Sequence, residues 1–112
     1  MKVVNRKNLK VINDICGQIQ EMCHTDNMSV AYIVVTGESI SHLHKKTEEI
    51  YFIIKGKGII NIDNKEKEVE KDDLIVIPKN KFHSIKKIGQ DSLELIAITN
   101  PRYNPDDVIE KE

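Results

Sequence analysis

The chain has 112 residues, and its 17 Lys and Arg against 18 Asp and Glu give a formal net charge of −1 at pH 7. This length allows one domain with a single core, so we expect residues 1–112 to form one domain. The charge balance argues against a nucleic-acid or membrane partner. Because there is no signal peptide and no long apolar stretch, we expect a cytoplasmic protein in which Cys16 and Cys23 are reduced.

The N-terminal part, residues 1–27, is expected to contain strands and turns, with at most a helical turn around residues 8–14. Strand signals are clear from residue 28 onward. Short runs rich in β-branched residues occur at 30–35, 50–54, 59–62, 74–77 and 93–98. Turn residues such as Gly, Asn and Asp separate these runs. The pattern predicts an all-β sandwich or barrel whose core covers roughly residues 28–99.

The segment His42-Leu43-His44 is the most informative part of the sequence. Side chains two positions apart on a strand point to the same face, so both imidazoles can reach one ion. Glu49 lies five residues beyond His44, which is the wrong parity for one uninterrupted strand. Residues 45–47 are therefore predicted to turn, so that a second strand brings the carboxylate back. His83 would complete the set from a third strand.

Three neutral imidazole nitrogens and one carboxylate oxygen suit a divalent transition metal such as Fe, Mn, Ni, Co or Zn. Calcium is disfavoured because it prefers oxygen ligands. Four protein ligands leave room for water or a substrate oxygen, whereas structural zinc sites are usually Cys-rich and closed. The alternative interpretation is that His42 and His44 are exposed strand-edge residues and that Glu48 and Glu49 are solvated charges.

Residues 37–87 resemble the two conserved motifs of the cupin superfamily. The first motif reads GESISHLHKKTEEIYFIIKGKG, and the family's motif residues fall on Gly37, His42, His44, Glu49 and Gly56. Counting six residues back from Gly56 selects Glu49 rather than Glu48 as the ligand, so Glu48 is expected to face outward. The resemblance implies a single-domain cupin-type β-barrel, a jelly-roll-like fold also called a double-stranded β-helix.

The second motif reads DDLIVIPKNKFHSIKK and matches the family pattern at Pro78 and His83. Asp72, Asn80 and Lys87 stand where the family has Gly, Gly and Asn. Asn is the best non-glycine residue for a left-handed turn position, so Asn80 is expected to keep the turn that aims His83 inward. Asp72 and Lys87 depart from the pattern at positions that are not metal ligands in the family.

The cupin scaffold hosts dioxygenases, isomerases, epimerases, decarboxylases and non-catalytic sugar binders, so the fold does not choose among them. The ligand set and the resemblance favour a small, dioxygenase-like metal-dependent enzyme acting on an oxygen-rich small molecule. Glu49 and Tyr51 are the candidate catalytic residues, although Tyr51 also fits a core position. The alternatives are a non-catalytic sugar or organic-acid binding module and a sugar or sugar-phosphate isomerase or epimerase. The isomerase ranks lower because the only arginines, Arg6 and Arg102, lie near the chain ends.

The run from residue 49 to 54 is apolar on two faces. Its odd positions share the face that holds the metal, and its even positions, Ile50, Phe52 and Ile54, form a second apolar face that must be covered. We expect a homodimer that packs sheets or exchanges edge strands, since large exposed apolar patches usually mark an interface. The alternative is that the N-terminal segment of the same chain covers this face.

The tail, residues 100–112, contains two prolines and an acidic end. We expect it to be extended rather than strand or helix. It either frays, as chain ends commonly do, or folds over the barrel mouth and places Tyr103 near the site.

Overall fold

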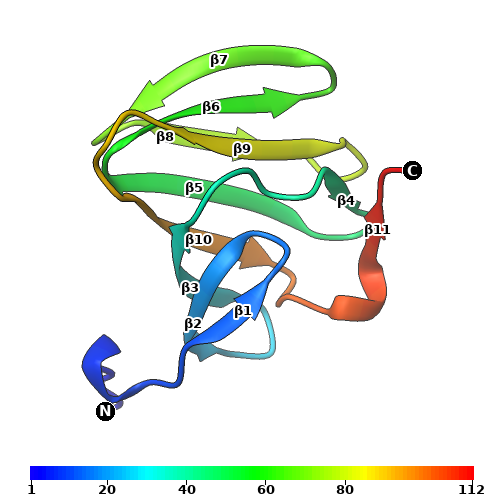
Figure 1. The fold of residues 1–112 in the computed structure, drawn as a ribbon. Coiled ribbons are helices and arrows are strands. Elements are labelled where there is room, and N and C mark those ends of the chain that lie inside the picture. The colour runs from blue at the N-terminus through cyan, green and yellow to red at the C-terminus, as the bar shows by residue number, and fades with distance from the viewer.

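A computed structural model describes residues 1–112 as two antiparallel sheets that enclose one core (Figure 1). The six-stranded sheet has the order β1 (Ile12–Asp14), β2 (Gly17–His24), β3 (Ser29–Val35), β10 (Leu93–Asn100), β5 (Glu48–Lys55) and β8 (Leu74–Ile77). The five-stranded sheet has the order β11 (Val108–Glu110), β4 (His42–His44), β9 (His83–Ile88), β6 (Lys57–Ile62) and β7 (Lys65–Glu70). Two 3-10 helices, η1 (Arg6–Asn8) and η2 (Pro105–Asp107), are the helical elements, and neither is long and apolar enough to cross a membrane.

The all-β prediction is confirmed, and the five predicted runs lie in β3, β5, β6, β8 and β10. The β7 strand was not predicted, because its sequence KEKEVE is charged at all but one position. Only Val69 is buried in it, and β7 pairs with β6 alone at the edge of its sheet. Charged side chains are common on edge strands because they oppose pairing with another chain.

The core lies between the sheets and is filled by the inward position of each strand. Along β10 the buried positions alternate strictly, and Leu93 and Leu95 are completely buried. Along β5 the same alternation turns Glu49, Tyr51 and Ile53 inward. Because the side chains of a strand alternate between its two faces, the even positions of β5 form the outer face, as the sequence predicts.

The N-terminal segment covers one end of the outer face of the larger sheet. The Arg6 guanidinium lies 3.9 Å from the centre of the Tyr32 ring and donates a hydrogen bond to Gln20 Oε1 at 2.9 Å. The other end of the outer face stays open, since Leu74 and Val76 of β8 are 58% and 60% exposed. The N-terminal segment therefore covers only part of the apolar outer face that the sequence predicts to be covered.

Two turns that precede β8 and β9 keep the left-handed backbone for which the family uses glycine. Asp72 has a φ of 74° and Asn80 a φ of 64°, so the prediction for Asn80 is confirmed and Asp72 takes the same conformation. The Asn80 N–H donates to the His44 carbonyl at 2.8 Å. This bond ties the loop before His83 to the strand that carries the other two histidines.

The tail corrects the sequence-based expectation, because it contains both a helical turn and a strand. Pro105 begins η2, and the Asn104 side chain caps this turn by accepting from the Asp106 N–H at 3.0 Å. Residues 108–110 then pair with β4 as β11. Pro105 thus marks the start of a turn rather than an irregular end, and the pairing is a long-range contact that local propensity does not encode. We call residues 101–110 the strap. Its red end in Figure 1, β11, lies alongside β4.

Candidate metal centre

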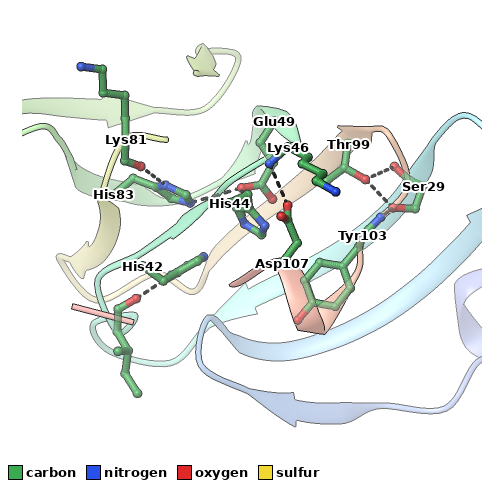
Figure 2. Close-up of polar contacts among 11 residues, drawn as sticks. Ser29, His42, His44, Lys46, Glu49, Lys81, His83, Thr99, Tyr103 and Asp107 are labelled. Atoms are coloured by element: carbon green, nitrogen blue, oxygen red, sulfur yellow. Dashed lines mark hydrogen bonds and ion pairs between the residues drawn. The ribbon is translucent and has the colours of Figure 1, made fainter. Parts of the chain in front are cut away.

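The four candidate ligands come from three strands and from both sheets. His42 and His44 lie on β4, and His83 lies opposite His42 in the register of β4 and β9. Glu49 comes from β5 in the other sheet, because the chain crosses between the sheets in the turn at residues 45–47. This turn is the one that the parity argument predicts. Figure 2 shows the four side chains pointing toward one another.

The four side chains form a compact, buried group. One ligand atom from each, a histidine nitrogen or a carboxylate oxygen, can be chosen so that all four lie within 4.8 Å of one another. The Nε2 atoms of His44 and His83 lie 3.3 and 3.2 Å from Glu49 Oε1. All four residues are at most 7% exposed. Glu48, by contrast, is exposed, which confirms that it faces outward.

Backbone carbonyls orient two of the three imidazoles. His42 Nδ1 lies 2.7 Å from the Ile40 carbonyl, and His83 Nδ1 lies 3.0 Å from the Lys81 carbonyl. A carbonyl only accepts, so each Nδ1 carries a proton and donates it, and in the neutral ring each Nε2 keeps its lone pair. Such outer hydrogen bonds typically fix the ring orientation and tautomer of histidine ligands to metals.

The polar atoms of the group lack the partners that burial normally demands. Both ring nitrogens of His44, the Nε2 of His83 and the Oε1 of Glu49 are buried without a hydrogen bond. Leaving a buried polar group unsatisfied costs about 1–3 kcal/mol, so such groups call for an explanation. A divalent ion bound to the Nε2 atoms of His44 and His83 and to Glu49 Oε1 would satisfy three of these four atoms, and nitrogen with carboxylate oxygen is a donor set that transition metals accept.

The protonation states also fit a cation. Burial is the largest cause that lowers the pKa of His42 to about 4, and the neighbouring His83 lowers it further. Burial alone would raise the pKa of Glu49, but the close polar contacts and charge interactions with His44 and His83 outweigh it and lower the pKa to about 2. At neutral pH the site therefore offers a neutral His42 and an ionised carboxylate, as metal binding requires.

A cavity of about 240 Å³ opens beside this group. His42, His44 and Glu49 line one part of it, and nine of its sixteen lining residues are hydrophobic. The apolar wall includes Ile19, Ala31, Ile33 and Ala97 from β2, β3 and β10. A small molecule in this cavity would contact the ligand group on one side and aliphatic side chains on the other.

Tyr51, the second predicted catalytic residue, belongs to the hydrophobic core cluster and is 2% exposed. Its ring centre lies 6.4 Å from that of His83. Burial, followed by the charge of Glu49, raises the pKa of Tyr51 well above its ordinary value of 10.0. The hydroxyl thus stays protonated near neutral pH and is suited to donating a hydrogen bond.

The tail contributes a wall of the cavity, which agrees with the second of the two alternatives for the tail, the one that places Tyr103 near the site. Tyr103 lines the cavity, and its ring centre lies 6.0 Å from that of His44. The Tyr103 N–H donates to Ser29 Oγ at 2.9 Å, and the Ser29 hydroxyl also contacts that of Thr99. Asp107 holds the strap further along, since its Oδ2 accepts from the Lys46 N–H at 3.0 Å.

Cys16 also lines the cavity, and its reactivity can be predicted. Burial, with smaller effects from Glu49 and Asp14, raises the pKa of its thiol from 9.0 to about 12 in the metal-free protein. At pH 8 this leaves about 1,000-fold less thiolate than an unshifted thiol has. We expect iodoacetamide to modify Cys16 at least 100-fold more slowly in the folded metal-free protein than in urea, as measured by peptide mass spectrometry. Equal rates would contradict the assignment.

Comparison with known proteins decides the family. A profile described as "Cupin domain" matches residues 29–99. The chain belongs to the cupin family. The sheets described above are accordingly those of a cupin-type barrel, and the match spans His42, His44, Glu49 and His83.

Three relatives illustrate the range of this cupin's similarities. An uncharacterised protein of Methanocaldococcus jannaschii is 32% identical over 96 residues, covering 80% of this chain and 77% of that protein. An oxalate-binding protein of Thermotoga maritima is 30% identical over 63 residues, which is 55% of this chain and 52% of that protein. The Streptomyces nucleoside dehydratase Pac13 has a TM-score of 0.86 at 15% identity over 100% of this chain and 92% of its own, and a further structure of Pac13 contains uridine.

Proposed function

We propose that this cupin holds a divalent transition metal, Fe, Mn, Ni, Co or Zn, through His42, His44, His83 and Glu49, and that it acts as a small metal-dependent, dioxygenase-like enzyme on an oxygen-rich small molecule. The observation that carries the proposal is the set of buried nitrogen and oxygen atoms without hydrogen-bond partners beside a cavity. A bound ion would supply Lewis acidity toward the oxygens of the small molecule, and iron would add oxygen chemistry.

The chain's own residues would hold and enclose the reactants. The carbonyls of Ile40 and Lys81 keep two imidazoles oriented, and Glu49, the ionised ligand, is the proposed catalytic carboxylate. The apolar wall and the Tyr103 strap limit the access of water to the ligand group. Tyr51 is the proposed hydrogen-bond donor behind the ligands, in keeping with its raised pKa.

A second candidate function is a non-catalytic module that binds a sugar or an organic acid at the ion. The similarity to a protein named oxalate-binding favours this candidate. A sugar-phosphate isomerase or epimerase remains the lowest-ranked alternative, because none of the sixteen residues that line the cavity is a lysine or arginine that would pair with a phosphate.

Turnover separates the two leading candidates. We would load the protein with ferrous iron and measure oxygen consumption with a panel of catechols, thiols and diketones. Consumption that depends on both the iron and one substrate class supports the enzyme. Tight binding of a sugar or organic acid, measured by calorimetry, with no oxygen consumption or product supports the binding module.

We also propose that the protein is a homodimer that packs through the open outer face of the larger sheet. Leu74 and Val76 of β8 and Ile98 of β10 supply exposed apolar side chains there, and such patches usually mark an interface. We expect light scattering to give twice the chain mass for the native protein and the monomer mass for Val76→Glu. Val3→Glu, at an exposed N-terminal position, is the control and should stay dimeric. A native mass of one chain at all concentrations would exclude the dimer.

The cytoplasm is the proposed compartment. Cys16 and Cys23 do not form a disulfide in the structure, and unpaired thiols suit a reducing environment. Fractionation of cells that express the untagged protein would test this assignment.

A further inference from the structure

The charged groups around the cavity are all of one sign. Among its lining residues the charged side chains are Asp14, Glu21 and Glu49, all acidic. Arg6, the arginine of the N-terminal segment, is held on the opposite face of β2 by Gln20. With a divalent ion at the ligand group, the three carboxylates would leave the lining with one net negative charge.

Asp14 is the acidic residue that a ligand would meet beyond the ligand group. It ends β1, and its Oδ1 accepts from the Ile15 N–H, a local bond that does not neutralise its charge. Glu21 is different, because its carboxylate pairs with His24 Nδ1 at 2.6 Å. Asp14 is therefore the carboxylate of the cavity, outside the ligand group, that has no histidine partner.

The candidate ligand group forms another part of the cavity lining. His44 and Glu49 are 4% and 7% exposed and have buried polar atoms without hydrogen-bond partners. Most other lining residues are apolar, with Ile15, Ile19 and Ile33 among them. A fitting molecule thus has oxygens toward the ligand group, an apolar body, and no negative charge of its own.

We propose that the cavity selects an uncharged or cationic small molecule with adjacent oxygens and an apolar body, and that Asp14 is the residue that discriminates against anions. This inference rests on the proposed function, since the oxygens of the molecule are taken to face the metal. It sets this cupin apart from a binder of dicarboxylates or sugar phosphates, whose second anionic group would lie among acidic and aliphatic side chains.

Three catechols of similar size test the proposal, namely 4-methylcatechol, 3,4-dihydroxybenzylamine and 3,4-dihydroxybenzoate, which are neutral, cationic and anionic. We would titrate each into zinc-loaded protein by calorimetry without oxygen. The benzoate should bind at least about tenfold more weakly than methylcatechol, as one repulsive charge pair a few ångströms apart predicts at an intermediate dielectric. The amine should bind at least as tightly as methylcatechol.

Variants assign the effect to one side chain. Asp14→Asn should reduce the ratio of the Kd of the benzoate to that of methylcatechol by threefold or more. Asp91→Asn, an exposed change in the β9–β10 loop, should leave this ratio unchanged. Benzoate binding as tight as that of methylcatechol, an unchanged ratio in Asp14→Asn, or no binding of any probe would overturn the inference. Zinc content in the same samples distinguishes failure of this inference from failure of the proposed function, because loss of zinc from the native protein would overturn the proposed function as well.

Discussion

Glu49→Gln should weaken metal binding by at least about 100-fold while Glu48→Gln leaves it unchanged. Loss of an outer hydrogen-bond partner of a metal ligand already costs about 10–100-fold in affinity, and Glu49 is assigned as a ligand itself. The substitution keeps the shape of the side chain and removes its charge, so the buried site at β5 should remain folded. Competition with a chromophoric chelator would measure both affinities.

Glu48 is a matched control because it precedes Glu49 directly and differs from it in orientation. Glu48 is exposed, whereas Glu49 is 7% exposed and contacts His44 and His83. Equal affinities in the two variants would refute the choice of carboxylate, and a loss confined to Glu48→Gln would reverse it.

The double variant His42→Ala/His44→Ala should abolish the stabilisation that a metal gives to the native protein. A ligand that binds only the folded state at 1,000 times its Kd stabilises it by about 4 kcal/mol. For a domain of this size that corresponds to a rise in Tm of roughly 10–20 °C. We expect this rise in the native protein and a shift near zero in the double variant, measured by calorimetry with zinc or ferrous iron.

The fourth histidine provides the control for this experiment. His24 is exposed and pairs only with Glu21, in contact with none of the candidate ligands. His24→Ala should therefore keep the full metal-dependent rise in Tm. Circular dichroism of the metal-free double variant should show an intact β-sheet spectrum, so a collapsed spectrum would mean that the lost shift reports unfolding instead.

The clustering of the four candidate ligands was predictable because it depends on strand parity and on short-range counting. His42 and His44 share a face by the period of two, and the five-residue step to Glu49 requires the turn that the structure shows. The left-handed backbone at Asn80 followed from residue type. Asp72 keeps the same geometry, so its departure from the family glycine has no effect on the turn.

The strap and the open face were harder to predict because they depend on contacts between distant parts of the chain. The pairing of Val108 with His44 joins residues 64 positions apart, and no local propensity in a proline-containing tail specifies it. Ser29, 74 positions earlier, helps to hold Tyr103 at the cavity by accepting its N–H. Likewise, the cover that η1 gives to Tyr32 depends on the position of Arg6, which no periodicity in residues 1–27 indicates.

Elemental analysis of untagged protein, purified without chelators, tests the central claim most directly. If His42, His44, His83 and Glu49 form a metal centre, mass spectrometry of the elements should find close to one transition metal per chain, and iron would direct the next assay toward oxygen chemistry. A protein that carries no transition metal, and takes up none of Fe, Mn, Ni, Co or Zn on reconstitution, would contradict the account.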